Sequence, residues 1–211
     1  EHRSPLVDRD IEDGTALSRV LEQLADATGD SASTTVADLM TRWDDAVARH
    51  RAGDLAAAAA TYAEVLREQP DWAPAWQLSG DIAHATGDPA QARVAFDRAL
   101  TAAPNFIEAR ISAAELALQT GDAGRAVTLA REGVVRAPRD AGLWRMLGRA
   151  QLAQRDAQQA AETFTRALRV APTSADLHFQ HGVALNQAGD AQGAARAWQR
   201  ERRAEAELRA A

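Results

Sequence analysis

The sequence contains no cysteine and no long apolar run, and these absences exclude several kinds of protein. Without cysteine the chain can form neither a disulfide nor a thiolate metal site, and it has no cysteine nucleophile. No segment approaches the roughly 18 to 20 apolar residues of a membrane-spanning helix, and no charged-then-apolar signal pattern opens the chain. We therefore expect a soluble protein without membrane insertion, located in the cytoplasm, with the periplasm left open.

The chain also has no lysine and no excess of positive charge. Thirty acidic residues stand against 24 basic ones, so the net charge is -6. A general nucleic-acid-binding protein needs a basic surface to neutralise phosphates. We therefore expect no nucleic-acid partner.

Catalytic and cofactor motifs are absent as well. The sequence has no Gly-rich phosphate loop and no GxSxG or HExxH pattern. His178 and His181 are spaced as two metal ligands on one helix face would be, with Asp176 near. A metal site needs a third protein ligand, and both histidines occupy core positions of the repeat described next. We expect no metal, no cofactor and no catalytic residue.

What the sequence does contain is a repeat of 34 residues. Five aspartates recur at this interval, namely Asp54, Asp88, Asp122, Asp156 and Asp190. Four prolines recur at the same interval, namely Pro70, Pro104, Pro138 and Pro172. An aspartate before an Ala-rich stretch favours a helix N-cap, the glycine before most of these aspartates suits a left-handed turn, and a proline ends a helix. Each interval therefore predicts two antiparallel helices.

These marks resemble the tetratricopeptide repeat (TPR) family of bacterial type, whose repeats have a pattern of Trp, Leu, Gly, Ala, an aromatic residue and Pro. One unit matches with Trp76, Gly80, Ala92, Phe96, Ala99 and Pro104, and another with Trp144, Leu147, Gly148, Ala160, Phe164, Ala167 and Pro172. The repeats run over about 39–72, 73–106, 107–140, 141–174 and 175–208. The third repeat is degenerate, with Arg110 at the Trp place, and the fifth has His178 there. The resemblance implies an all-α fold, a right-handed superhelix or α-solenoid of about five helix-turn-helix repeats.

The N-terminal part departs from this pattern. In the first repeat the apolar stripe is rotated, and it runs through Val36, Leu39, Met40, Trp43 and Val47. Upstream, a second helical stripe consists of Leu17, Val20, Leu21 and Leu24. The Ser/Thr-rich stretch GDSASTT between the stripes predicts a linker. We therefore predict an acidic N-terminal segment over 1–35 with a capping helix at about 15–28, followed by a TPR domain over 36–211.

In TPR proteins the first helices of the repeats line a concave groove that receives a peptide or a helix of a partner. The resemblance implies that the groove consists of Trp43, Val47, Gln77, Asp81, His84, Glu108, Ile111, Glu115, Leu118, Arg145, Arg149, Leu152, Phe179, Val183 and Asn186. Its middle is acidic. Arg145 and Arg149 lie one helical turn apart and could clamp a partner carboxylate, with solvated surface arginines as the alternative.

We therefore expect a non-catalytic protein–protein interaction scaffold that binds a partner peptide or helix in this groove. Two alternatives stay open. One is a targeting or regulatory TPR arm of a larger bacterial enzyme, such as a glycosyltransferase or sulfotransferase, and the other is a scaffold that assembles as a homo-oligomer. The chain begins at Glu1 without an initiator methionine, which leaves both a processed chain and a fragment open. Fold alone does not decide between these functions.

Overall fold

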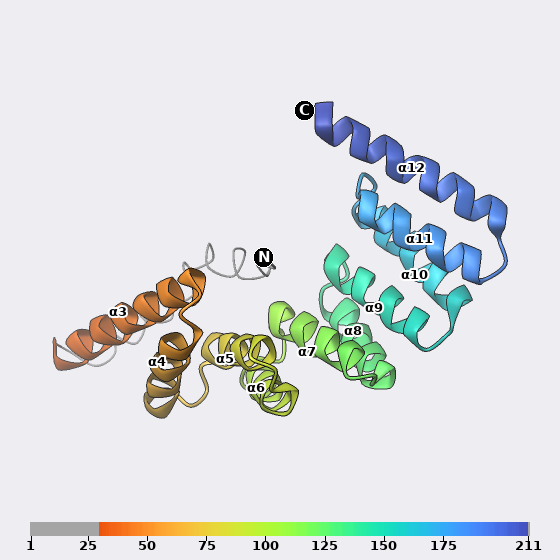
Figure 1. Ribbon diagram of the computed structural model, residues 1–211. Helices are drawn as coiled ribbons and strands as arrows, with labels where there is room; N and C mark the ends of the chain where they lie inside the picture. The colour runs from red at the N-terminus through yellow and green to blue at the C-terminus, as the bar shows by residue number, and fades with distance from the viewer. Residues whose placement is uncertain (1–29, 211) are drawn as a thin grey trace. The chain divides into compact units, whose positions relative to one another are not determined.

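The computed structural model describes residues 30–210, with side chains from Ala37 to Arg209, and every regular element in this range is an α-helix. The chain divides into two compact units after Pro104 (Figure 1). Unit 1 contains α3 (Asp30–Ala52), α4 (Leu55–Glu68), α5 (Ala73–Ala85) and α6 (Pro89–Ala102). Unit 2 contains α7 (Ile107–Gln119), α8 (Ala123–Arg136), α9 (Ala141–Ala153), α10 (Ala157–Val170), α11 (Ala175–Gln187) and α12 (Ala191–Ala210). The expected all-α class is confirmed.

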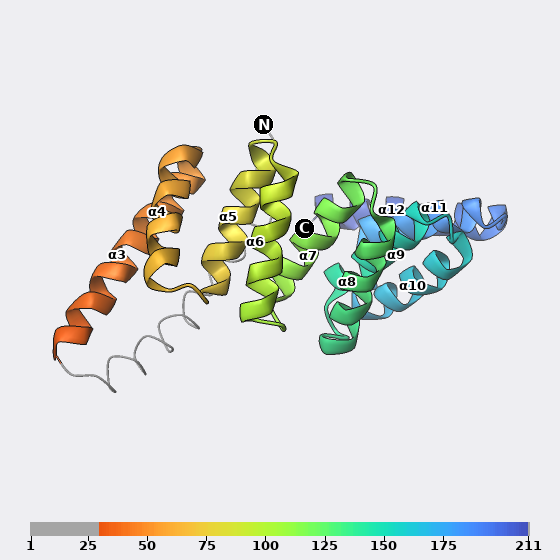
Figure 2. The ribbon, with the colours of Figure 1, turned by 90° about the horizontal axis from the view of Figure 1, so that it is seen from below.

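Consecutive helices in each unit pack side by side as helical hairpins (Figures 1 and 2). The pairs α5–α6, α7–α8, α9–α10 and α11–α12 span residues 73–102, 107–136, 141–170 and 175–210. Each of the four spaced prolines follows the end of a second helix by two residues, because proline cannot continue the hydrogen-bond ladder. None of the described helices is long and apolar enough to cross a membrane.

The spaced aspartates cap the second helices, as predicted. The Asp88 carboxylate accepts a hydrogen bond from the backbone N–H of Gln91 at 2.9 Å. The equivalent bond is made by Asp54, Asp122, Asp156 and Asp190. The residue before the cap takes a left-handed backbone, with φ +83° at Gly87 and +65° at Arg155. Arg155 therefore adopts the turn that glycine provides in the other repeats.

In each well-matched hairpin, a glycine of the first helix packs directly against an aromatic ring of the second helix. A Cβ atom built on Gly148 of α9 would lie 2.5 Å from the Phe164 ring of α10, and Phe164 is fully buried. The same contact joins Gly80 to Phe96. Any larger residue at the glycine place would push the two helices apart.

The two helices of the degenerate third repeat pack against each other in a different way. Arg110 stands at the Trp place with only 4% of its surface exposed, and its Nη1 donates to Glu132 Oε2 at 2.8 Å. Its aliphatic stem lies against Gly133 of α8, and the Leu143 side chain of α9 lies there too. The buried charge is thus paired, and the surrounding apolar cluster continues from α7 and α8 into α9.

The first repeat corrects part of the N-terminal prediction. The expected Ser/Thr-rich linker is wrong from Asp30 onward, since α3 begins at that residue. The rotated stripe is confirmed where side chains are described: Leu39 packs with Val65 of α4, and Val47 packs with Leu78 of α5. Its contacts are therefore with its own repeat and the next one. The predicted capping helix over 15–28 lies outside the described residues.

Candidate partner-binding surface

The groove residues predicted in unit 1 lie on α3 and α5, and two of them are buried. Val47 is 6% exposed and Gln77 is 1% exposed, so neither presents a surface to a partner, which corrects the prediction for these two residues. Gln77 Nε2 donates to Asp81 Oδ2 at 2.6 Å. Asp81 and His84 are half-buried and remain the residues that a partner could reach here.

Trp43, the remaining groove candidate of unit 1, belongs mainly to an aromatic cluster. Its ring stacks on Trp72 with a centroid distance of 4.7 Å and an interplanar angle of 26°. Trp43 also contacts Tyr62, which is fully buried, with a distance of 5.4 Å between the ring centroids. Burial raises the pKa of the Tyr62 phenol and lowers the pKa of the neighbouring His50. Trp43 is half-buried by this packing and offers a partner only part of its ring.

The two arginines of α9 in unit 2 are already paired within the molecule. Arg149 donates from Nη1 and Nη2 to the two carboxylate oxygens of Glu115 on α7, at 2.6 and 2.9 Å. Arg145 Nη1 donates to Asp176 Oδ2 of α11 at 3.3 Å. The prediction of a clamp for a partner carboxylate is corrected accordingly, because a ligand would have to displace these carboxylates first. Glu115 and Arg149 are one repeat period apart and occupy equivalent positions on the first helices of adjacent repeats.

Five of the apolar groove candidates lie on the first helices of unit 2 and are partly exposed. Ile111, Leu118, Leu152 and Val183 are half-buried, and Phe179 of α11 is 47% exposed. Phe179 and Val183 lie four residues apart and share a helix face. Glu108 is half-buried and Asn186 is exposed. Glu115, one of the acidic residues expected in the middle of the groove, is neutralised by Arg149.

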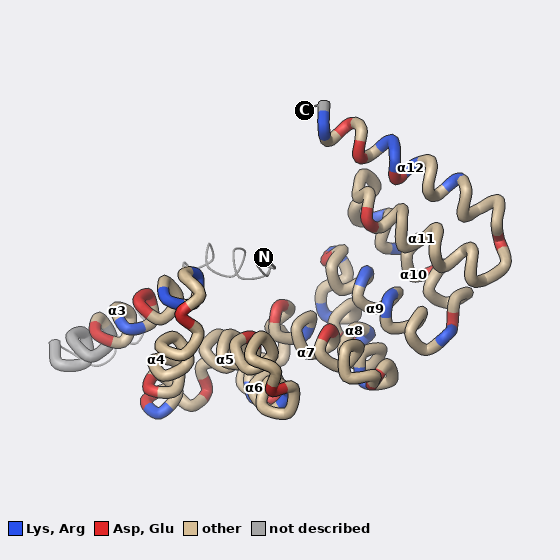
Figure 3. Tube along the Cα trace, in the orientation of Figure 1, with Lys and Arg blue, Asp and Glu red and all other residues tan. Residues whose placement is uncertain are grey.

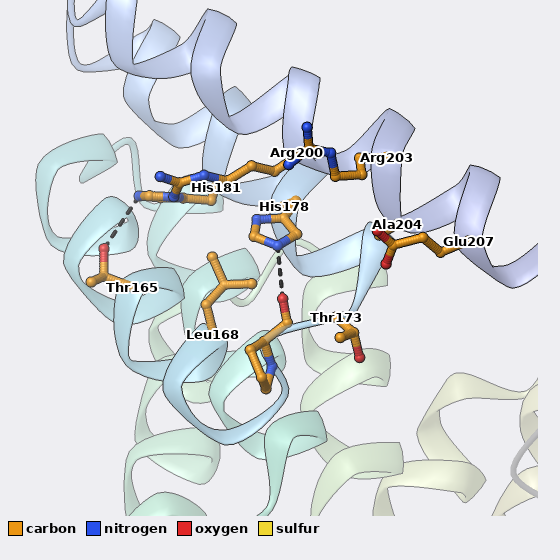
Figure 4. Close-up of a pocket in the computed structure, with 10 residues that line it drawn as sticks. Thr165, Leu168, Thr173, His178, His181, Arg200, Arg203, Ala204 and Glu207 are labelled. Carbon is orange, nitrogen blue, oxygen red and sulfur yellow. Dashed lines mark hydrogen bonds between the residues drawn. The ribbon is translucent and has the colours of Figure 1, made fainter.

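The histidines of α11 face a different side. His178 is 8% exposed and donates from Nε2 to the Pro172 carbonyl at 2.9 Å. His181 Nε2 lies 3.2 Å from Thr165 Oγ1, and burial, with His178 and Arg200 nearby, lowers the pKa of His181. A cavity of about 420 Å³ lies beside them, between α10, α11 and α12 (Figure 4). Sequence reasoning missed this cavity, although the loss of Trp at position 178 was its signal.

Comparison with known proteins agrees with the fold. Family models described as tetratricopeptide repeat match residues 44–107 and 145–208, and also residues 83–150. No curated protein matches the chain. Among solved structures, the chain is similar to a MamA crystal structure, with 15% identity and a TM-score of 0.72 over 79% of this chain and 97% of that one.

Two further structures show the same likeness. MamA from Desulfovibrio magneticus RS-1, from residue 41 to its end, has 20% identity and a TM-score of 0.72, covering 80% of this chain and 96% of that one. YrrB, a TPR protein with an unusual peptide-binding site, has 16% identity and a TM-score of 0.65, covering 77% and 84%. At these identities the likeness concerns the arrangement of the helices.

Proposed function

The chain belongs to the tetratricopeptide repeat family, and from this premise we propose that it is a non-catalytic scaffold that binds a partner protein through the first helices of unit 2. The surface that carries the proposal consists of Ile111, Leu118, Leu152, Phe179 and Val183. Phe179 supports it most, because nearly half of this large apolar side chain is exposed, four residues before the half-buried Val183 on the same helix. Such patches mark interaction sites.

The charge arrangement favours an apolar ligand over an acidic one. Because Arg149 is held at both nitrogens by Glu115, a partner carboxylate would have to break two existing hydrogen bonds to gain two new ones. Burial of the exposed part of Phe179 has no such competitor and would contribute about 1 kcal/mol or more. We therefore propose an amphipathic helix, or an extended peptide with apolar side chains, as the ligand.

Site-specific crosslinking in the native cell tests this proposal. A photoreactive amino acid replaces Phe179 in one variant and Val135 in a control variant. Val135 lies on α8 of the same unit and is 77% exposed, but it belongs to a second helix and lies outside the proposed surface. We expect a discrete crosslinked protein from position 179 that mass spectrometry identifies and that position 135 does not capture.

Two outcomes would contradict the proposal. Capture of the same protein at both positions would show contact without a preferred surface. A crosslink from position 179 only to a second copy of the chain would replace the separate partner by self-assembly.

A further inference from the structure

The cavity of unit 2 lies apart from the proposed groove. It is lined by His178 and His181 of α11, whereas the groove uses Phe179 and Val183, which point to a different side of the same helix. Leu168 and Ala204 give the cavity apolar walls. In Figure 4 these side chains, with Arg200 and Arg203 of α12, surround one open space.

The cavity coincides with the place where other repeats carry a tryptophan. Trp76 Nε1 donates to the Pro70 carbonyl at 2.7 Å, and Trp144 Nε1 donates to the Pro138 carbonyl at 2.8 Å. His178 makes the same bond to the carbonyl six residues before it. The imidazole thus keeps the polar contact of the indole but lacks its second ring. The indole of Trp144 packs against two apolar clusters, and at position 178 the corresponding volume is open.

The fourth and fifth repeats each have an arginine near this place. The guanidinium carbon of Arg166 lies 6.0 Å from the centre of the Trp144 ring, within the range of a cation–π contact. Arg200 stands 34 residues after Arg166 and lines the cavity beside His178. No Phe, Tyr or Trp is among the residues that line the cavity. Arg200 therefore stands where Arg166 stands in the fourth repeat, but the lining of the cavity offers it no aromatic ring for a cation–π contact.

The second ring nitrogen of His178 is buried without a partner. His178 Nδ1 has no hydrogen-bond partner, although the residue is more than nine-tenths buried. Because a carbonyl only accepts, Nε2 carries the proton toward Pro172, and Nδ1 of the neutral ring is an acceptor. Figure 4 shows it on the side of the imidazole that faces Arg200 and His181. A buried acceptor without a donor is unfavourable. Nδ1 has almost no accessible surface, so it is covered from the open space of the cavity.

The charges at the cavity favour an acidic ligand. Helix α12 has five arginines and three glutamates, and its basic positions recur along its length (Figure 3). Arg200 and Arg203 line the cavity with Glu207 as the single carboxylate. Within the described part of the chain, neither arginine makes an ion pair. The acidic N-terminal segment over 1–35 contains no Phe, Tyr or Trp, so it does not supply the missing ring.

We propose that this cavity is a docking site for a tryptophan side chain in an acidic segment of a partner protein. The indole fills the volume beside His178, and its face lies under Arg200. Carboxylates on either side of the tryptophan pair with Arg200 and Arg203. The fifth repeat would then be completed by a residue from the partner, at the place where the second and fourth repeats use their own.

A labelled peptide tests the proposal directly. The probe is fluorescein-labelled Glu-Glu-Trp-Glu-Glu with an amidated C-terminus, and its anisotropy is measured with the full chain. A leucine in place of the tryptophan removes the aromatic ring, and we expect about ten-fold weaker binding. Arg200→Ala should weaken binding about three-fold or more. The matched control is Arg202→Ala, on the same helix but outside the cavity, and it should leave the dissociation constant unchanged.

His178→Trp is the decisive variant because it fills the cavity with the chain's own ring. We expect it to fold, as the second and fourth repeats do with this residue, and to lose binding of the peptide about ten-fold or more. If circular dichroism shows that it does not fold, Ala204→Leu narrows the cavity from α12 and takes its place. Phe179→Ser should leave binding unchanged, which separates this site from the groove.

Three results would overturn the proposal. The first is equal affinity for the tryptophan and leucine peptides. The second is unchanged affinity in His178→Trp or Ala204→Leu. The third is self-association of the chain that the peptide competes with and that His178→Trp abolishes, since a second copy would then be the occupant.

Discussion

Replacing Gly148 by alanine should destabilise unit 2, whereas the same change at Gly124 should stabilise it. The new Cβ at position 148 would lie 2.5, 2.7 and 2.8 Å from three atoms of the Phe164 ring, where apolar carbons normally keep about 3.5 to 4 Å. Phe164 is fully buried, so the ring must move by about 1 Å against its own neighbours. Overpacking of this kind costs about 1 to 3 kcal/mol.

Helix propensity acts in the opposite direction at both positions. Alanine is favoured over glycine in a helix by about 1 kcal/mol, and by less in the first turn, where Gly124 lies. At Gly148 this gain offsets only part of the clash, and we expect a net loss of about 1 to 2 kcal/mol. At Gly124 the nearest atom to the new Cβ would be 3.7 Å away, so we expect a gain of about 0.5 kcal/mol.

Urea denaturation followed by circular dichroism measures the free energy of unfolding of both variants. Hydrogen exchange in α9 and α10 measures the local stability of this hairpin. Exchange is needed because repeat arrays do not always unfold in one step. If Gly148→Ala were as stable as the parent chain, the close approach of α9 and α10 would not be the reason for glycine at this place. Equal destabilisation by Gly124→Ala would show that the effect does not depend on the local space.

The remaining predictions concern ion pairs, protonation and cooperativity. In a double-mutant cycle, Glu115→Gln and Arg149→Ala should couple by about 0.5 to 1 kcal/mol, since both side chains are partly exposed; additive effects would show that the pair contributes nothing. Burial lowers the pKa values of His50 and His181 in the folded chain. Between these lowered pKa values and the ordinary value of about 6.5, the unfolded chain binds more protons than the folded chain. The free energy of unfolding is therefore greatest above pH 6.5 and falls as the pH drops toward 5. A His50→Gln, His181→Gln variant should lose part of this dependence between pH 7.5 and 5.5, and an unchanged slope would contradict the assignment. Thermal unfolding should be broad or stepwise, and a single transition with uniform hydrogen exchange would argue against independent hairpins.

Several features could be predicted from the sequence because short-range interactions determine them. Asp88 caps a helix that begins one residue later, and Gly87 takes the left-handed turn immediately before it. Pro104 ends its helix through its own missing N–H. Such interactions span a few residues, so the 34-residue period was sufficient to place the hairpins. The rotated stripe through Leu39 and Val47 was likewise readable from helical spacing.

The partner-binding surface was predicted only in part, because exposure depends on contacts between repeats. Phe179 is exposed as a groove residue would be, whereas Val47 and Gln77 are buried by neighbouring helices. Arg149 and Glu115 are 34 residues apart, and no local pattern announces that they form two hydrogen bonds to each other. The family pattern identifies a helix face, but it does not say which side chains on that face are already paired.

The sequence by itself determined the helices, their caps and the order of the repeats, since each of these follows from residues close together in the chain. Tertiary structure alone decided which charges are neutralised and where space remains. The cavity beside His178 requires the walls that α10 and α12 provide, and the exchange of Trp for His leaves a volume only once those helices are packed at the spacing of the other repeats. Volume and burial are properties of three packed helices together, and no single segment of the chain carries them.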